Sequence, residues 1–449
     1  MIPDETPEPP TRRAAFRFWF ALGFISFGGP AGQIAIMHRE LVVRRRWISE
    51  RRFLHALDYC MLLPGPEATQ LAVYLGWLLH RTRGGVVAGT LFVLPSLAIL
   101  IALSWIYLRY GQVAAIAGAL WAIKPAIVAI VLHAAWRVGR RALGHPLLWA
   151  IAATAFVALQ VFDLPFPAII VTAALAGVAG ARVVPAAFTA RGGHAADGAP
   201  HLRAVIDDDT PPPAHARWSR ARFASTIAVF VAIWAGAFAS IAVLPAADGT
   251  LVAMTWLFTK AALVTFGGAY AVLPYLVQQA VDVHGWLTAA QMIDGLALGE
   301  TTPGPLIMVV AFVGFVGAWT AAPLGPDAVA AAGVAGAVVA TFFTFLPSFL
   351  FILAGGPLIE ATHGEARITA PLTGITAAVV GVIASLAAFF ALHVFWPGGF
   401  SAAASLEGLD AASLAIFVAS LIALFFADIG VIPLVFAAAI VGLGRAVAT

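Results

Sequence analysis

The stretch Leu62-Leu63-Pro64-Gly65-Pro66-Glu67-Ala68-Thr69-Gln70 decides how this chain must fold. It lies inside an apolar run, residues 53–79, that would otherwise form one uninterrupted membrane helix. The two prolines have no backbone N–H to donate and the glycine between them relaxes the chain, so one helix should end near residue 63 and another begin near Pro66. Hydrocarbon tolerates such a break only where the freed backbone is buried in protein or lines a cavity. The fresh helix N-terminus carries unpaired N–H groups and partial positive charge, which suits an anion.

The composition is that of a membrane protein. Of 449 residues, 61% are hydrophobic and only 10% are charged, whereas a soluble domain has about 25% charged residues. Repeated apolar runs of about 17 or more residues predict an all-α polytopic protein. Residues 1–10 are acidic and Pro-rich, with no basic segment before a short apolar run, so we expect no cleaved signal peptide. Cys60 is the only cysteine, which excludes a disulfide within the chain.

The second half of the chain repeats the first. Pro303-Gly304-Pro305 follows Pro64-Gly65-Pro66 by 239 residues, and Phe27-Gly28-Gly29 and Trp47 recur at the same offset. The recurring partners are Phe266-Gly267-Gly268 and Trp286; after small insertions, Leu94-Pro95-Ser96 matches Leu346-Pro347-Ser348 and Asp163 matches Asp428. We therefore predict two homologous repeats, each with broken or re-entrant helices.

The arginines predict the orientation of the repeats. Both flanks of residues 53–79 are basic, which favours a re-entrant hairpin with both ends in the cytoplasm and Pro64-Gly65-Pro66 at its tip. The same logic applies to residues 14–37. Residues 223–244 then cross once, and the loops of the second repeat are poor in Arg, as an outside location requires. We therefore expect an inverted repeat whose broken helices meet near the membrane midplane.

Four regions follow from this pattern. We expect a first repeat over residues 1–184, a cytoplasmic linker over 185–222, an extra span and connection over 223–254, and a second repeat over 255–449. The linker is assigned from its Pro, Gly, Asp and Arg content.

Two sets of spaced motifs carry a resemblance to a known family. The first set is Phe27-Gly28-Gly29-Pro30, Gln33, Trp47, Phe53, Pro64-Gly65-Pro66, Gln70, Gly76, Phe92, Pro95 and Ser96; the second is Phe266-Gly267-Gly268, Trp286 and Pro303-Gly304-Pro305. Over essentially the whole chain this resembles the chromate ion transporter family in its long two-domain form. The resemblance implies chromate export driven by the membrane potential or the proton gradient, and chromate resistance. One departure is that Ala269 stands where the first repeat has Pro30, so the two tips differ chemically.

A dianion in a low-dielectric site needs compensating charge and hydrogen-bond donors. The tips of both repeats would supply backbone N–H groups, and the alternative is helix kinking and close packing with no ligand. The predicted substrate-binding residues are Gly28, Gly29, Pro30, Gln33, Pro64, Gly65, Pro66, Gln70, Lys124, Gly267, Gly268, Pro303, Gly304 and Pro305. Thr69, Ser96 and Ser348 are further neutral donors, for which hydrogen bonding between helices is the alternative.

Charged side chains at membrane depth are the sharpest individual candidates, because they are costly there and usually face a cavity or a partner. Lys124 would give the oxyanion positive charge; the alternative is a structural ion pair with Glu67, Asp58 or Glu300. Lys260, the only other lysine, would snorkel to the interface. Four acids are candidates to carry a coupling proton: Glu67, Asp58, Asp294 and Glu300. For Glu67 the alternative is stabilisation of a helix N-terminus, and no sequence feature chooses among the four.

Other function classes fit less well. The chain has no nucleotide-binding G-x-x-x-x-G-K-[ST], no H-E-x-x-H and no G-x-S-x-G, so we expect neither an ATP-driven pump nor an enzyme. We expect no cofactor and no metal site. A sulfate or other oxyanion transporter and an anion channel stay open as alternatives. The expected partners are chromate or a related oxyanion and the lipid bilayer of the cytoplasmic (inner) membrane, with no nucleic acid, and a homodimer is left open.

Overall fold

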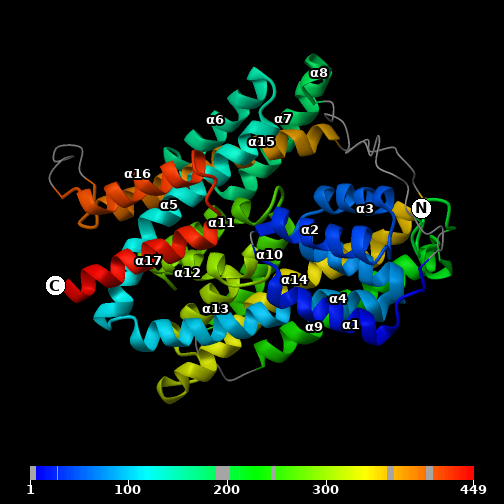
Figure 1. The fold of residues 1–449 in the computed structure, drawn as a ribbon, viewed down its shortest axis with the longest axis horizontal. Coiled ribbons are helices and arrows are strands. Elements are labelled where there is room, and N and C mark those ends of the chain that lie inside the picture. Colours follow the sequence, from blue (N-terminus) through cyan, green and yellow to red (C-terminus); the bar gives the residue numbers. More distant parts are fainter. Residues whose placement is uncertain are drawn as a thin grey trace.

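The computed structural model describes residues 7–27, 29–188, 203–211, 213–243, 249–361, 369–400 and 408–448, and these residues are mostly helical (Figure 1). Within them the one β-type pairing is an isolated bridge between Ile48 and Ile206. Six helices of the described part are long and apolar enough to cross a membrane, and several shorter apolar helices accompany them. The expected all-α polytopic membrane fold is therefore confirmed.

The first repeat begins with short helices and continues with longer ones. Its elements are α1 (Arg12–Ile25), α2 (Gly29–His38), the π-helix η1 (Arg39–Arg44), α3 (Glu50–Leu62), α4 (Glu67–Tyr110), α5 (Ala114–Ala142), α6 (Pro146–Gln160) and α7 (Phe166–Val183). The connection to the second repeat contains α8 (Pro185–Phe188), η2 (Ala214–Ala216) and α9 (Arg220–Ala242).

The second repeat follows the same order. Its elements are α10 (Thr250–Val264), α11 (Ala269–Val277), the π-helix η3 (Gln278–Val283), α12 (Ala289–Thr301), η4 (Leu306–Met308), α13 (Val309–Ala321), η5 (Pro326–Ala328), α14 (Val329–Ala361), α15 (Thr369–Phe395), α16 (Ala411–Phe425) and α17 (Val431–Ala448).

Unusual backbone features recur at matched positions and confirm the duplication. The two π-helices, η1 and η3, lie 239 residues apart. Gly65 and Gly304 have φ of +114° and +107°, a conformation that only glycine adopts readily. Asp163 and Asp428, the matched residues before the last helix of each repeat, have φ of +47° and +48°. π-Helices and positive φ angles are uncommon. Their recurrence at matched positions shows that the two repeats share the detailed path of the backbone.

The predicted break at Pro64-Gly65-Pro66 is present. Helix α3 ends at Leu62, and α4 starts at Glu67 with Pro66 as its N-cap residue. The helix then bends at His80 and Arg81, whose φ and ψ are not helical, so residues 67–79 form a separate arm. Arg52 near the start of α3 and Tyr74 in that arm both contact Glu360, so the two arms return to the same end of the molecule. Residues 50–79 are thus a hairpin, hereafter hairpin 1.

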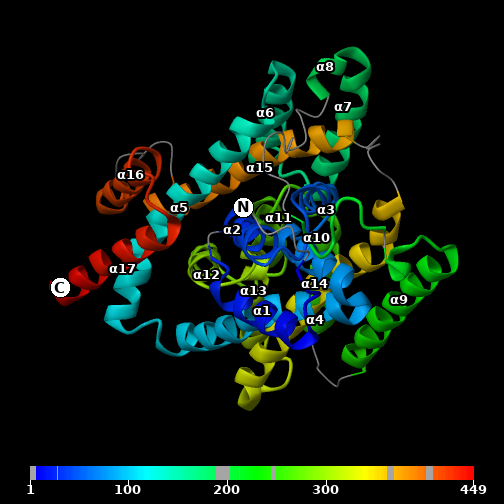
Figure 2. The same cartoon turned by 45° about the vertical axis from the view of Figure 1, so that its right-hand side comes forward.

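The equivalent segment of the second repeat, residues 289–321, is hereafter hairpin 2. Helices α10 to α13 lie in the middle of the molecule in both views, with α5, α6, α7 and α15 layered on one side (Figures 1 and 2). Helix α13 is buried almost throughout. Helix α9, by contrast, has no buried residue and packs on the outside against α14, as an added span would.

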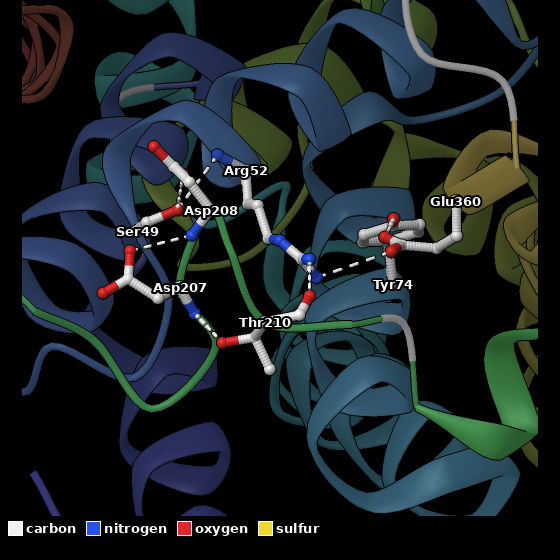
Figure 3. A network of polar contacts seen from close by, with 7 residues as sticks. All are labelled: Ser49, Arg52, Tyr74, Asp207, Asp208, Thr210 and Glu360. Carbon is white, nitrogen blue, oxygen red and sulfur yellow. Dashed lines mark hydrogen bonds and ion pairs between the residues drawn. The ribbon is translucent and has the colours of Figure 1, made fainter. Parts of the chain in front are cut away.

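Part of the linker is packed against hairpin 1. Residues 203–211, hereafter the strap, run beside the loop that precedes α3 (Figure 3). Ile206 N donates to Trp47 O at 3.1 Å, and Ser49 N donates to Ile206 O at 3.0 Å. Ser49 Oγ also donates to Asp208 Oδ1 at 2.5 Å. The expected linker is therefore, in this part, a structural element of the first repeat.

Candidate functional site

The two Pro-Gly-Pro tips meet the opposite repeats through matching hydrogen bonds. Gly65 N donates to Thr265 O at 2.7 Å, and Gly304 N donates to Ser26 O at 2.8 Å. Ser26 and Thr265 are themselves matched positions, each preceding a Phe-Gly-Gly motif. Each tip thus closes on the Phe-Gly-Gly turn of the other repeat, which is the reciprocal pattern that a two-fold relation produces.

The Leu-Pro-Ser motif that the two repeats share also faces the tips. A Cβ placed on Gly65 would stand 2.7 Å from Ser348 Oγ, and one placed on Gly304 would stand 2.7 Å from Ser96 Cβ. Those serines belong to the matched Leu-Pro-Ser motifs, and each faces the tip of the other repeat. The tips need glycine for two reasons, the positive φ and the absence of room for a side chain.

The two glutamines that bind the tips both belong to the first repeat. Gln33 Nε2 donates to Gly304 O at 2.5 Å, and Gln70 Nε2 donates to Pro64 O at 2.7 Å. The positions that match them 239 residues later are Val272 and Val309, which cannot make such bonds. The backbone of the site is therefore symmetric, while its side-chain chemistry is not.

Several buried polar atoms around the tips have no hydrogen-bond partner. They include Gln33 Oε1, Gln70 Oε1, Thr69 Oγ1, Ser96 Oγ and Ser348 Oγ. The five side chains are fully buried. An unpartnered buried polar group costs about 1–3 kcal/mol, so a cluster of them calls for an explanation. Three hydroxyl groups free to donate are well suited to the oxygens of an oxyanion.

Lys124 lies in a second polar cluster. Its Nζ is 3.4 Å from Asp294 Oδ2 of hairpin 2, and Tyr107 OH donates to the same oxygen at 2.9 Å. Asp294 is 4% exposed, and its Oδ1 has no partner. The ion pair that the sequence offered as the alternative for Lys124 is present, but with Asp294 instead of Glu67, Asp58 or Glu300. In the described part of the chain no polar contact joins Lys124 to either tip.

The other acids occupy different environments. The carboxylate of Glu67 lies 3.8 Å from where a Cβ on Gly268 would stand, so it faces the turn of the second repeat from the first turn of α4. Glu300 is buried and accepts a hydrogen bond from Tyr270. Asp58 is on an exposed face of α3, and Lys260 is exposed on α10. The structure thus buries Asp294 and Glu300, half-buries Glu67 and leaves Asp58 at the surface.

The remaining predicted positions surround the two turns. Pro66 and Pro305 are the N-cap residues of α4 and η4, and Pro303 precedes the second tip glycine. Gly29 and Pro30 begin α2, and a Cβ on Gly29 would meet no atom within 4 Å. A Cβ on Gly267 would stand 3.4 Å from Val379. Gly28 lies outside the described residues.

Sequence reasoning missed the tyrosines and the linker contacts. Tyr107, Tyr270 and Tyr74 each bind a buried carboxylate, on Asp294, Glu300 and Glu360. A tyrosine in an apolar run carries no signal of its partner. The basic flank of residues 53–79 includes Arg52, whose Nη1 is 3.5 Å from Glu360 Oε2 and whose guanidinium donates to Thr210 O of the strap (Figure 3).

Comparison with known proteins supports the resemblance. The family model described as chromate transporter matches residues 13–178 and 252–443, one match in each repeat. A chromate transport protein of Pseudomonas aeruginosa is 33% identical over 85% of this chain and 81% of its own length. A chromate transport protein of Cupriavidus metallidurans is 28% identical over 83% of this chain and 81% of its own length.

A shorter relative bears on the repeat. An uncharacterized transporter of Bacillus subtilis is 30% identical over 38% of this chain but 96% of its own length. It is therefore about one repeat long, as expected if the long form arose by duplication. No solved structure gave a match.

Proposed function

This chain is a member of the chromate transporter family, and on that premise we propose that it is a secondary transporter that exports chromate across the cytoplasmic membrane. The observation that carries the mechanism is the reciprocal closure of the two Pro-Gly-Pro tips beside buried hydroxyl groups that have no partner. In this proposal the repeats are inverted, so the tips enter from opposite sides and meet at a central site.

Chromate is a tetrahedral dianion, and the tips offer what it needs. The hydroxyls of Ser96, Ser348 and Thr69 donate to its oxygens once the tips separate, and the N–H groups of Gly65 and Gly304 become free at the same time. In the closed arrangement those N–H groups are satisfied by Thr265 O and Ser26 O. Substrate and tip closure therefore compete for the same donors, which is how binding can drive a change of conformation.

In this proposal, Lys124 and Asp294 control the net charge of the binding site. While paired, the two side chains are together neutral and attract a dianion weakly. A chromate oxygen that displaces Asp294 from Lys124, or a proton that neutralises Asp294, leaves Lys124 as fixed positive charge for the substrate. In this proposal Asp294 is, of the four candidate acids, the one whose protonation state controls the charge of the site, because it is the one in contact with a lysine. Its proton stays on the protein when chromate leaves.

The membrane potential is sufficient to drive export. Moving one charge across 100 mV is worth about 2.3 kcal/mol, so a dianion leaving a negative interior gains about twice that amount. A proton travelling outward with chromate would halve the charge moved and the driving force. Potential-driven export without an accompanying proton is therefore the favoured scheme, and cells that carry the protein should tolerate more chromate.

The test is uptake of radiolabelled chromate into inside-out vesicles, in which export appears as accumulation. A potassium diffusion potential, positive inside, should drive accumulation even when a protonophore is present, and excess sulfate should compete weakly. Vesicles from cells that lack the protein are the negative control. Stronger competition by sulfate than by unlabelled chromate would reassign the cargo. Single-channel currents carried by chromate would replace the transporter by a channel.

A further inference from the structure

A basic cavity of about 570 Å³ lies between the start of α1 and the bend in α4, away from the tips. Arg12, Arg81 and Arg83 line it together with His80, while Phe16 and Val87 form part of its apolar wall. Its lining thus combines cationic groups with the kind of surface that contacts hydrocarbon.

Among the described residues, no carboxylate pairs with the arginines of this cavity. Within the described residues, no carboxylate lies within 4.0 Å of a side-chain nitrogen of Arg12, Arg81 or Arg83. The Nε2 atom of His80 is buried and has no hydrogen-bond partner. Three guanidinium groups and one unsatisfied ring nitrogen therefore border the same space. Guanidinium groups bind phosphate oxygens in a bidentate way, which makes a phosphate the natural ligand class.

The bend in α4 brings two of these arginines to the cavity. Arg81 has φ of +59° and ψ of −163°, a conformation that a non-glycine residue rarely adopts. The bend separates the hairpin arm, residues 67–79, from the rest of α4. It places residues 81–83 beside the first turns of α1. In the second repeat, the matching connection between α13 and α14 contains no arginine or lysine. The cavity is therefore specific to one side of the molecule.

An aromatic ladder leads away from the cavity along the outside of α1. Phe16, Phe20 and Phe24 are spaced four residues apart, and each is about half exposed, at 50%, 48% and 45%. The rings of Phe16 and Phe20 are 6.3 Å apart, and those of Phe20 and Phe24 are 5.1 Å apart. Such a continuous apolar strip suits an acyl chain and offers nothing to a small soluble anion.

From this juxtaposition we propose that the cavity binds the phosphate headgroup of an anionic phospholipid, with one acyl chain along Phe16, Phe20 and Phe24. The leaflet is the cytoplasmic one, because the arginine-rich side of a membrane protein faces the cytoplasm. Basic pockets between membrane helices on that side are suited to anionic headgroups. The site does not depend on the transported substrate, so it stands or falls separately from chromate export.

The test uses the full-length protein in phosphatidylcholine nanodiscs that contain increasing amounts of phosphatidylglycerol, with the bound lipid followed by native mass spectrometry. The variant R12Q/R81Q/R83Q should bind phosphatidylglycerol at least about tenfold more weakly than the wild type, since each basic residue contributes to the attraction. The matched control R13Q/R51Q/R141Q removes the same charge from exposed arginines that do not line the cavity, and it should bind normally. Thermal unfolding in phosphatidylcholine alone checks that each variant is folded; the single variant Arg83→Gln replaces the triple variant if that one unfolds.

The aromatic ladder separates a lipid from a free anion. The variant F20A/F24A should weaken phosphatidylglycerol binding, and inorganic phosphate should not displace the lipid. Equal weakening by both arginine triples would mean unspecific attraction and would overturn the site. Normal lipid binding by F20A/F24A, together with displacement by inorganic phosphate, would overturn the assignment to a phospholipid and leave an oxyanion pocket.

Discussion

Hairpin 1 and hairpin 2 share a backbone but differ in where their charges lie. Both arms break at Pro-Gly-Pro, and both tips close on the opposite Phe-Gly-Gly turn. At its base hairpin 1 is fastened by Arg52, Tyr74, Glu360 and the strap (Figure 3). Hairpin 2 has the capping box of Thr288 and Gln291 at its start, and its buried carboxylates, Asp294 and Glu300, are within its arm. Duplication has thus preserved what shapes the chain, while the two copies have acquired different chemistry.

This difference suggests a division of labour. We interpret hairpin 1 as the fixed half, because an ion pair and several hydrogen bonds anchor its base to α14 and the linker. Hairpin 2 is the responsive half, because neutralising Asp294 would change its contact with α5.

The largest effect is expected at the shared tips. Gly65→Ala and Gly304→Ala each place a Cβ at positive φ and within 2.7 Å of the facing serine. Strain of about 3 kcal/mol at either tip should lower chromate transport by about 100-fold. Gly236→Ala on α9 is the control, because no atom lies within 4 Å of its added Cβ. If only one tip variant lost activity, the symmetric role of the tips would be wrong.

The next largest loss of transport is expected at the ion pair between Asp294 of hairpin 2 and Lys124 of α5. Lys124→Met leaves Asp294 buried without its cation, and we expect about a tenfold loss of transport at neutral pH. Lowering the pH should restore the stability of this variant but not its transport, because protonation removes the stranded charge without supplying a cation for chromate. The double variant K124M/D294N should fold as stably as the wild type without recovering transport. Full activity of Lys124→Met would remove Lys124 from the mechanism while leaving the fold intact.

The base of hairpin 1 should respond in stability more than in transport. Arg52 is mostly buried and links Glu360 to Thr210 of the strap. Arg52→Gln should destabilise the protein by about 2 kcal/mol, the scale of a hydrogen bond to a charged group, as seen in the melting temperature in detergent. Arg51→Gln, on the exposed face of the same helix, is the control. A large loss of transport with unchanged melting temperature would show that hairpin 1 also moves.

A smaller effect is expected from the strap itself. Asp208→Asn weakens the bond from Ser49 Oγ and should cost about 1 kcal/mol. The strap should then be cut faster in limited proteolysis. Asp209→Asn is the matched control, since Asp209 is exposed. Equal cleavage of the two variants would mean that the strap is held by its backbone bonds alone.

The smallest effect concerns pH. His215, just after the strap, donates to Trp77 O at 3.0 Å, and burial lowers the pKa of its imidazole, with Arg81 and Arg222 acting in the same direction. A histidine whose pKa is lowered on folding stabilises the folded state less as the pH falls below about 6.5. Melting temperature should therefore fall between neutral pH and pH about 5 in the wild type, and less so in His215→Gln. An identical pH dependence of the two proteins would contradict this role.

The features that were predictable from sequence are those set by single residues. Two prolines and a glycine force a break wherever they stand, so both tips, the repeat and the hairpin ends followed from the chain. The partners in space did not follow. Nothing near Lys124 in sequence points to Asp294, 170 residues away, and Asp208 lies in a stretch that is indistinguishable by composition from a solvated linker. Long-range pairing depends on how the repeats dock, which periodicity does not encode.

The central claim is that the two repeats enter the membrane from opposite sides, and Arg44 and Val283 test it most directly. They are matched positions 239 residues apart, at the ends of η1 and η3, and both are well exposed, with the Arg44 side chain at 68% and Val283 at 61%. Single cysteines at each position, in a Cys60→Ala background, are labelled with a membrane-impermeant maleimide in right-side-out and inside-out vesicles. We predict that the cysteine at position 44 reacts only in inside-out vesicles and the cysteine at position 283 only in right-side-out vesicles. Reaction of both from the same side would contradict the inverted repeat.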